Sequence, residues 1–527
     1  MSSIREMPDA APAGSAPYDL LVVGGGINGC GIARDAAGRG ARVLLVEQHD
    51  LASHTSSAST KLIHGGLRYL EYYEFRLVRE ALIERERLLR IAPHIIWPMR
   101  FVLPHSKLVR PAWLLRAGLF LYDHLCPRMS LPKTRALNFR KDPTGRPLKD
   151  DYTRGFAYSD GWVQDSRLVA LNAMDAAAHG AEIRTRTKLV NAKRRADIWE
   201  ATIENSDTGS TRTVRAKAIV NAAGPWVAEL LQDKVHVASR NKVRLVKGSH
   251  IVVPKMFEGT QAYILQNPDK RIVFAIPYEG RFTLIGTTDV AWEQDAGHVE
   301  ISPEEVTYLC DSVNRYFKSA ITADDVVWTY AGVRPLYDDN SGSASAVTRD
   351  YVLDVDASAA PILSVFGGKI TTFRKLAEHA LEKLAPHLPV LNKPEWTADK
   401  PLPGGDFDGR QFKALVDRLQ NHAPHLDPRT TYRLARNYGT RAFDIATKTI
   451  EEMGEDFGAG LTQREVDYLI DNEWARSAED ILWRRSKLGL FVSKEDATRI
   501  QDYIARRNVP SLSAQTKQDL EWRQNVA

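Results

Sequence analysis

A glycine-rich segment near the N-terminus limits the possible fold more than any other feature of this sequence. An apolar run, Leu20–Val23, leads into the pattern Gly24-x-Gly26-x-x-Gly29, a helix of small residues follows, and a second apolar run ends at Glu47. A strand–turn–helix–strand unit of this kind binds dinucleotides, because its glycines let the backbone approach a pyrophosphate and the helix N-terminus attracts negative charge. The terminal acid is placed to accept hydrogen bonds from ribose hydroxyls. The segment therefore predicts an α/β domain that binds FAD or NAD.

The composition excludes several classes of protein. A chain of 527 residues is too long for one hydrophobic core, so we expect two or three domains. The net charge of +5 is small for that length and no basic block stands out, which argues against a nucleic-acid partner. Cys30, Cys126 and Cys310 lie too far apart in sequence to indicate a disulfide framework or a metal site. We expect no bound metal and a reducing cytosol.

Two segments bear on membrane contact. Residues 1–17 are rich in Ala, Pro and Ser and lack the apolar core of a secretory signal, so we expect a disordered tail. No segment approaches the roughly 20 apolar residues that a membrane-spanning helix needs. Residues 107–129 are nevertheless apolar nearly all round, with Trp113, Leu119 and Phe120 among them and basic residues at the margins. This segment is either a buried helix or a membrane-contacting interfacial helix.

Two later motifs favour FAD over NAD. One strand ends at Gly224, and another enters a helix through Gly367, Gly368 and Lys369. Both turns can return to the first glycine loop, and the second places a helix N-terminus toward the ribityl chain and the flavin ring. A plain nicotinamide enzyme needs no such late return to its cofactor. Since no Cys or His stands in a fixed attachment motif, we expect the FAD to be non-covalent.

Changes in pattern along the chain predict its domains. Short β-rich runs indicate an antiparallel lobe inside the nucleotide domain, and a Pro- and Gly-rich stretch precedes a helical region. The expected domains are an FAD-binding domain at 18–385 with an interleaved substrate lobe at approximately 241–334, a linker at 386–409 and a C-terminal helical domain at 410–527. In the last of these, Thr462-x-x-Glu465 predicts a capping box at the start of a helix.

Several longer strings resemble one known family. They are SSASTKLIHGGLRYLE (56–71), VKGSHIVVP (246–254), WTYAGVRPL (328–336), LSVFGGKITTFRKLAEHALEKL (363–384) and GEDFGAGLTQREVDYLIDNEWARSAEDILWRR (454–485). Together they resemble the FAD-dependent glycerol-3-phosphate dehydrogenases, the respiratory type that passes electrons to quinone, across roughly residues 18–510. The resemblance implies an α/β fold with a glutathione-reductase-type FAD-binding domain, an antiparallel β-rich substrate lobe and a C-terminal α-helical domain.

The resemblance also implies an activity. The protein is expected to oxidise sn-glycerol 3-phosphate to dihydroxyacetone phosphate, with hydride transfer from C2 to FAD and onward transfer of electrons to a membrane quinone. We accordingly expect a peripheral protein at the cytoplasmic face of the inner membrane, acting as a homodimer. The alternatives are an FAD-dependent oxidase of another small hydroxy or amino substrate, and a regulatory flavoprotein that binds its ligand without turnover.

The substrate phosphate is a dianion, and arginine supplies the bidentate donors that suit it. Resemblance of the motifs assigns Arg68, Arg334 and Arg349 to the substrate region, and Arg334 is expected beside the flavin as a catalytic residue. Arg349 has an alternative role as the ion-pair partner of the acid that follows it. Lys369 is expected to bind the substrate phosphate or to stabilise charge on the reduced flavin, and Thr287 to hydrogen-bond the substrate.

A base must accept the proton of the C2 hydroxyl. His250 is our candidate, because its ordinary pKa near 6.5 suits proton transfer at neutral pH. The alternative is a core histidine whose hydrogen bonds are satisfied. The residues expected to contact FAD are Gly24, Gly26, Gly29, Glu47, Ser59, Thr60, Gly65, Gly66, Gly224, Gly368, Lys369 and Thr371.

Overall fold

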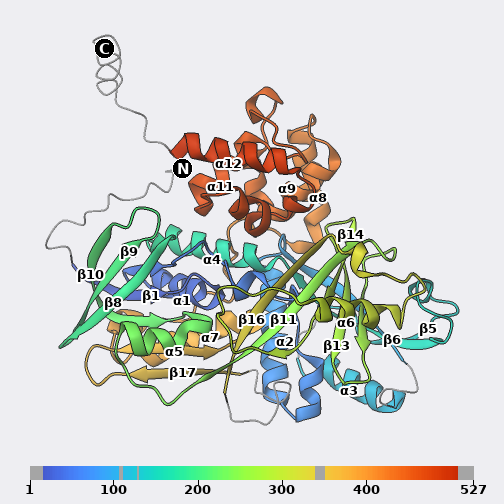
Figure 1. The fold of residues 1–527 in the computed structure, drawn as a ribbon, viewed down its shortest axis with the longest axis horizontal. Coiled ribbons are helices and arrows are strands. Elements are labelled where there is room, and N and C mark those ends of the chain that lie inside the picture. The colour runs from blue at the N-terminus through green and yellow to red at the C-terminus, as the bar shows by residue number, and fades with distance from the viewer. Residues whose placement is uncertain (1–15, 106–110, 127–129, 339–349, 509–527) are drawn as a thin grey trace.

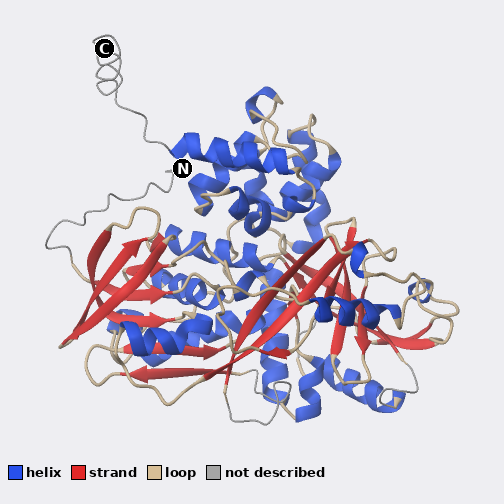
Figure 2. Cartoon of the chain, viewed as in Figure 1, coloured by secondary structure: helices blue, strands red, loops and turns tan. Residues whose placement is uncertain are grey.

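Two β-sheets lie side by side, and a helical domain packs above them (Figure 1). The computed structural model describes residues 16–105, 111–126, 130–338 and 350–508. Figure 2 shows the strands in two groups and the C-terminal domain built from helices. Most of the predicted tail, residues 1–15, lies outside the described residues.

The first sheet carries the glycine-rich motif. Its strands, in spatial order, are β17 (Tyr351–Asp356), β18 (Ile362–Gly367), β10 (Thr211–Asn221), β1 (Tyr18–Val23), β2 (Val43–Val46) and β7 (Glu182–Arg184), and β9 (Ile198–Asn205) and β8 (Thr187–Arg195) extend from β10. The strands from β18 to β7 are parallel, whereas β17 and β9 are antiparallel to their neighbours. Leu20 and Val22 of β1 face one hydrophobic core, and Leu21 and Val23 face the other. A parallel strand covered on both faces needs apolar residues at every position, which explains the continuous apolar run.

Helices cover the face of this sheet that Leu20 and Val22 line. They are α1 (Ile27–Gly38), α4 (Asp165–Ala178) and α7 (Phe373–Leu384), and α1 lies against both of the others. Buried Ala33 and Ala36 in α1 allow the helices to pack closely. The opposite face of the sheet is covered by the β8–β9 hairpin and the short α5 (Val227–Glu229). The turn after β1 therefore opens at the carboxyl edge of the parallel strands, where α/β sheets bind ligands.

The second sheet forms the substrate lobe. Its strands, in order, are β15 (Val290–Ala291), β11 (Val243–Pro254), β14 (Phe282–Gly286), β13 (Ile272–Tyr278), β12 (Ala262–Gln266), β4 (Ile96–Pro104), β6 (Arg154–Val163) and β3 (Leu62–Ile63), with β16 (Trp328–Tyr337) beside β11 and β5 (Arg135–Asn138) beside β6. The lobe therefore extends beyond the predicted 241–334, since β3 to β6 come from residues 62–163. Their strand signal is weak because β3 has only two residues and β4 contains Pro98 and Pro104.

Three helices pack against the lobe. Helix α6 (Pro303–Asn314) contributes Leu309 and Val313 to one of its cores. Helices α2 (Phe75–Ile91) and α3 (Ala112–His124) contribute Val78, Leu82 and Leu119 to the other. The predicted segment 107–129 is therefore represented in the structure by α3, and its residues 107–110 and 127–129 lie outside the described part of the chain.

The C-terminal domain is helical, as predicted. Its helices are α8 (Phe412–His422), α9 (Pro428–Tyr438), α10 (Ala442–Ile445), α11 (Gln463–Glu473) and α12 (Lys494–Asn508). Thr462 precedes α11, but its side chain makes no cap hydrogen bond, so the predicted capping box is wrong. Glu465 instead accepts hydrogen bonds from Arg433 at 2.5 and 2.8 Å, because a buried carboxylate is stabilised more by a guanidinium fork than by a backbone amide.

Candidate active site

A cavity of about 1100 Å³ is lined by residues of both sheets. Its walls bring together Gly24, Gly26, Glu47, Ser59, Thr60, Gly66, Arg68, Gly224, Thr287, Arg334, Gly368, Lys369 and Thr371. Of the other predicted site residues, Gly29, Gly65 and His250 do not line it, and Arg349 lies outside the described residues. Among the described residues, no group of three or more His, Cys, Asp or Glu side chains is placed to hold a metal ion.

The glycine turn has the geometry that a pyrophosphate site needs. Gly24 has φ +114°, and a Cβ there would lie 2.4 Å from the carbonyl oxygen of Ala222. A Cβ on Gly29 would lie 1.9 Å from the carbonyl oxygen of Gly24, so only glycine lets α1 approach β1 this closely. Gly29 thus shapes the site from behind, whereas Gly24 and Gly26 lie on the cavity wall.

Glu47 follows β2 on the wall of the same cavity. Its carboxylate accepts hydrogen bonds from the backbone N–H groups of Gly25 at 2.7 Å and His49 at 2.8 Å. Burial raises the pKa of Glu47, and these two N–H donors act in the opposite direction by stabilising the carboxylate. The carboxylate is therefore oriented beside the glycine turn, where it fits the hydroxyls of a dinucleotide ribose.

The 59–66 segment forms another part of the wall. Ser59 donates its hydroxyl hydrogen to Asp165 at 2.7 Å, and Lys61 forms a buried ion pair with Asp165 at 2.9 Å. Gly65 donates its N–H to the Tyr122 hydroxyl at 2.8 Å and packs away from the cavity. Ser59 therefore faces the cavity with its hydroxyl already engaged, and Gly65 acts through packing.

The predicted substrate cations come together in the cavity. Arg334 donates one terminal N–H to Asp289 at 2.5 Å and the other to Thr287 Oγ1 at 2.9 Å. The Lys369 ammonium lies 3.9 Å from the centre of the Tyr69 ring. Arg68, also on the wall, supplies another positive charge. Such a set favours a phosphate dianion over a neutral or singly charged substrate.

His250 lies behind the wall. Its side chain is fully buried in β11, its ring stacks on Tyr330 with centroids 4.6 Å apart, and Nε2 lies 3.0 Å from Thr60 Oγ1. Burial lowers the pKa of His250 well below its ordinary value, and the positive charges of Arg334 and Lys61 lower it further. The imidazole is therefore neutral. It does not line the cavity itself, but it is hydrogen-bonded to the hydroxyl of Thr60, which does.

Three cavity residues were missed by sequence reasoning. His64 lines the cavity, and burial together with the charge of Lys369 lowers its pKa to about 4. Asp289 holds Arg334, and Tyr69 lies beneath Lys369. His64 and Tyr69 lie in the string HGGLRYL (64–70), which resembles the family. That resemblance could have indicated both of them as site residues.

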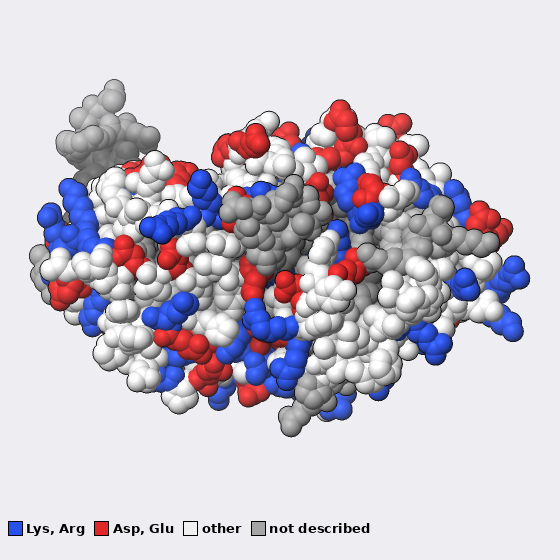
Figure 3. Space-filling view, turned by 90° about the horizontal axis from the view of Figure 1, so that it is seen from below, with Lys and Arg blue, Asp and Glu red and all other residues white. Residues whose placement is uncertain are grey.

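The cavity also reaches an exposed apolar surface on α3. Leu114 and Leu115 of this helix line it, while Trp113 and Phe120 are 72% and 64% exposed. Leu119 is fully buried, so one face of α3 belongs to the core and the face that carries Trp113 and Phe120 is exposed. Contact of that face with a membrane stays a prediction. Figure 3, seen from the side on which α3 lies in Figure 1, shows a broad uncharged area with Lys and Arg at its margin. Among the described residues, no helix is both long and apolar enough to cross a membrane.

Comparison with known proteins assigns the family. Residues 19–374 match the family of FAD dependent oxidoreductases, and residues 396–518 match the C-terminal domain of alpha-glycerophosphate oxidase. A glycerol-3-phosphate dehydrogenase of Pseudomonas aeruginosa is 57% identical over 492 residues, which cover 92% of this chain and 95% of that protein. The chain belongs to the FAD-dependent glycerol-3-phosphate dehydrogenase family.

Two further relatives refine this assignment. The glycerol-3-phosphate dehydrogenase of Bacillus halodurans, solved with FAD, is 28% identical with a TM-score of 0.73, over 93% of this chain and 94% of that one. This confirms the predicted fold class and FAD as the cofactor. The D-erythritol 1-phosphate dehydrogenase of Brucella abortus is 53% identical over 494 residues, 93% of this chain and 98% of that protein. Two relatives of similar identity are thus named for different polyol phosphates.

Proposed function

We propose that the protein oxidises sn-glycerol 3-phosphate to dihydroxyacetone phosphate and delivers the electrons to a membrane quinone. The observation that carries the proposal is the presence of Arg68, Arg334 and Lys369 in the same cavity as the dinucleotide-binding glycine turns. An amino- or hydroxy-acid oxidase needs a site for one carboxylate, which a single arginine can provide. Three cations suit the higher charge of a phosphate monoester.

The chain's own residues bind and orient the substrate. Asp289 and Thr287 fix the Arg334 guanidinium, so its remaining N–H groups are already directed when the substrate arrives. Lys369 and Arg68 neutralise the phosphate charge. FAD, when bound, supplies the acceptor for the hydride that leaves C2.

The C2 hydroxyl proton needs a route away from the substrate. Thr60 lines the cavity and is hydrogen-bonded to the neutral imidazole of His250. We infer that the Thr60 hydroxyl accepts the substrate proton while passing its own to Nε2 of His250. The imidazole is uncharged before the substrate binds, so Nε2 is free of a proton that would block this transfer.

Anaerobic reduction of the bound flavin tests the substrate assignment. We expect sn-glycerol 3-phosphate to bleach the visible flavin band, and glycerol, lactate and glycine to leave it unchanged, because only the first carries a phosphate for the three cations. Stopped-flow absorbance with each compound measures this. Bleaching by lactate or glycine would favour an oxidase of another small substrate. If no compound bleaches the flavin, the result would favour a regulatory flavoprotein.

A four-carbon polyol phosphate is the second candidate substrate, because the Brucella abortus relative is named for D-erythritol 1-phosphate. The same reduction assay with D-erythritol 1-phosphate decides between the two. The ratio of the two kcat/KM values identifies the preferred chain length. The phosphate-binding cations are expected to serve either compound.

The exposed face of α3 supports delivery of electrons at a membrane. We expect Trp113→Ser with Phe120→Ser to reduce binding to anionic lipid vesicles by at least tenfold, because these exposed rings are the side chains that would enter the lipid interface. Co-sedimentation with vesicles measures this, and reduction of the flavin by substrate should be unchanged. Ile450→Ser in the C-terminal domain, 53% exposed, is the matched control. Equal loss of vesicle binding by the control would contradict the assignment of α3.

Leu119 is not replaced in the vesicle-binding test, because a buried side chain cannot contact lipid. It was grouped with Trp113 and Phe120 at the sequence level, but its side chain is fully buried. Its replacement by Ser would destabilise the fold rather than the membrane contact. The homodimer, the non-covalent attachment of FAD and the position at the cytoplasmic face of the inner membrane stay predictions.

A further inference from the structure

A buried cluster of charges joins the C-terminal domain to the loop that follows β2. Asp50 lies in this loop and is 1% exposed. Arg485 donates both terminal N–H groups to its carboxylate, each at 2.7 Å, and Arg484 donates Nε–H to it, also at 2.7 Å. A bidentate guanidinium–carboxylate pair of this kind has one favoured geometry, so it fixes the position of the loop as well as its charge.

A second ion pair holds the other side of the same loop. Arg186, between β7 and β8, donates to Asp480 of the C-terminal domain at 2.8 and 3.0 Å. The backbone N–H of Arg186 donates to the His49 carbonyl at 2.8 Å. Burial tends to raise the pKa of Asp480, but the charges of Arg484, Arg186 and Arg485 prevail and lower it. The carboxylate is therefore ionised and paired at neutral pH.

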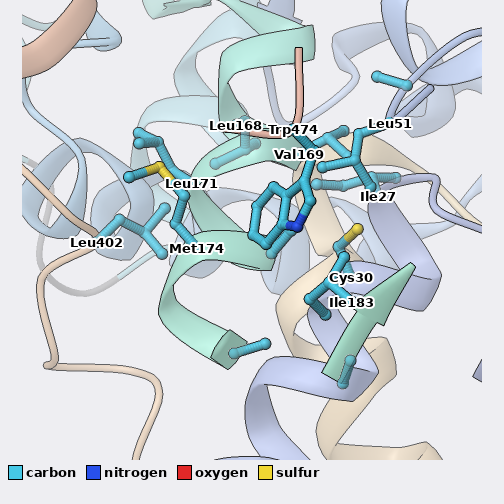
Figure 4. Packing of buried hydrophobic residues seen from close by; sticks show 14 of the residues in the cluster. Ile27, Cys30, Leu51, Leu168, Val169, Leu171, Met174, Ile183, Leu402 and Trp474 are labelled. Carbon is cyan, nitrogen blue, oxygen red and sulfur yellow. The ribbon is translucent and has the colours of Figure 1, made fainter. Parts of the chain in front are cut away.

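Apolar packing reinforces these ion pairs. Trp474, which follows α11, is 7% exposed and belongs to the same buried cluster as Leu51, Ile27 and Val169. Figure 4 shows its indole ring among these side chains, close to the start of α1. Trp474 of the C-terminal domain and Leu51 of the loop thus belong to one continuous hydrophobic core.

The braced loop touches the dinucleotide-binding turn directly. Ala52 donates its N–H to the Gly25 carbonyl at 3.1 Å, and Ser56 Oγ accepts the N–H of Ile27, the first residue of α1, at 3.0 Å. A Cβ on Gly25 would lie 2.7 Å from Cβ of Glu47, which shows how tightly the loop packs on the turn. Residues of this loop from Glu47 to Thr60 also line the cavity.

We propose that the C-terminal helical domain braces the loop at 47–60 and thereby sets the affinity of the protein for FAD. Asp50, Arg484 and Arg485 act as positioning residues, since none of them lines the main cavity. The brace holds the glycine turn and Glu47 in the arrangement that receives the dinucleotide before it binds. Such preorganisation raises affinity because the loop need not be ordered on binding. The proposal rests on FAD as cofactor and not on the identity of the substrate.

The test measures FAD affinity in Asp50→Asn and in a control variant. Asparagine keeps the size of the side chain and removes the charge that both arginines require. Arg433→Gln is the matched control, because it removes an ion pair with Glu465 inside the same domain without touching the loop. Titration of each apoprotein with FAD, followed by flavin fluorescence, gives the dissociation constant, and thermal unfolding of each apoprotein gives its stability. We expect both variants to unfold at lower temperature and only Asp50→Asn to bind FAD at least tenfold more weakly.

A milder variant covers the case in which Asp50→Asn does not fold. Arg484→Lys keeps the charge but loses the Nε–H bond to Asp50, and we expect a rise of about threefold in the rate of FAD release. Unchanged FAD affinity in Asp50→Asn overturns the proposal. So does an equal loss of FAD affinity in Arg433→Gln, since that would show a general effect of stability. If only Arg484→Lys folds, an unchanged release rate overturns it.

Discussion

Arg334→Gln should lower kcat/KM for sn-glycerol 3-phosphate by about 30- to 400-fold while FAD stays bound. Removal of one partner from a hydrogen-bonded charge pair costs about 2–5 kcal/mol, and we expect the lower half of that range because the Arg334 side chain is 29% exposed. The substitution also leaves the Asp289 carboxylate without its guanidinium partner in the cavity, where it would repel the phosphate. Steady-state kinetics with a quinone analogue and the absorbance ratio of flavin to protein measure the two quantities.

A double variant separates these two effects. Arg334→Gln with Asp289→Asn removes the unpaired carboxylate, so we expect it to recover part of the activity lost in Arg334→Gln alone. Arg271→Gln is the control, since Arg271 is exposed to a similar degree and pairs with Asp269 at 2.7 Å, but does not line the cavity. A loss of kcat/KM below tenfold in Arg334→Gln would show that Arg68 and Lys369 suffice for the phosphate.

The local parts of the nucleotide site were predictable from sequence because each has a short-range cause. Gly24 must adopt a positive φ, Gly29 must admit a close helix–strand contact, and Glu47 directly follows the next strand along the chain. These requirements act within about 30 residues and leave their mark on the residue types themselves. The same holds for Gly368, which has φ +104° at the entrance to α7.

Other parts depend on contacts that no local pattern encodes. Asp50 and Arg485 are 435 positions apart in the chain, and neither is distinguishable in sequence from a surface charge. Helix α3 carries apolar residues on both faces, so only packing against the lobe decides that Leu119 is core and Phe120 is exposed. The alternation of β11 places His250 on one face of the strand. The local pattern does not show that Thr60 lies between its ring and the cavity, or that β14 and β16 flank it, because these are long-range contacts.

The position of His250 gives its own test. We expect His250→Gln to lower kcat by about 10²-fold or more, because general-base catalysis contributes roughly 10²–10⁴ in rate. Thr60→Val should produce a loss of similar size, since either change interrupts the relay, and the double variant should be little worse than each alone. Flavin reduction in a stopped-flow instrument isolates this step from quinone reduction. Tyr330→Phe, which keeps the ring stacked on His250 but removes its hydroxyl bond to Ser59, controls for packing.

The pH dependence follows from the environment of the imidazole. Burial and the nearby positive charges of Arg334 and Lys61 hold the pKa of His250 well below 6.5, so the imidazole is neutral at neutral pH, but it is a weaker proton acceptor than a histidine with its ordinary pKa. The rate of flavin reduction should therefore show no inflection from His250 near pH 6.5, and any decline caused by its protonation should appear only at much lower pH. If His250 is a core residue without a chemical role, the two substitutions should have different effects from those expected for the relay. In that case His250→Gln would lower thermal stability, Thr60→Val would reduce flavin at the wild-type rate, and the relay would be wrong.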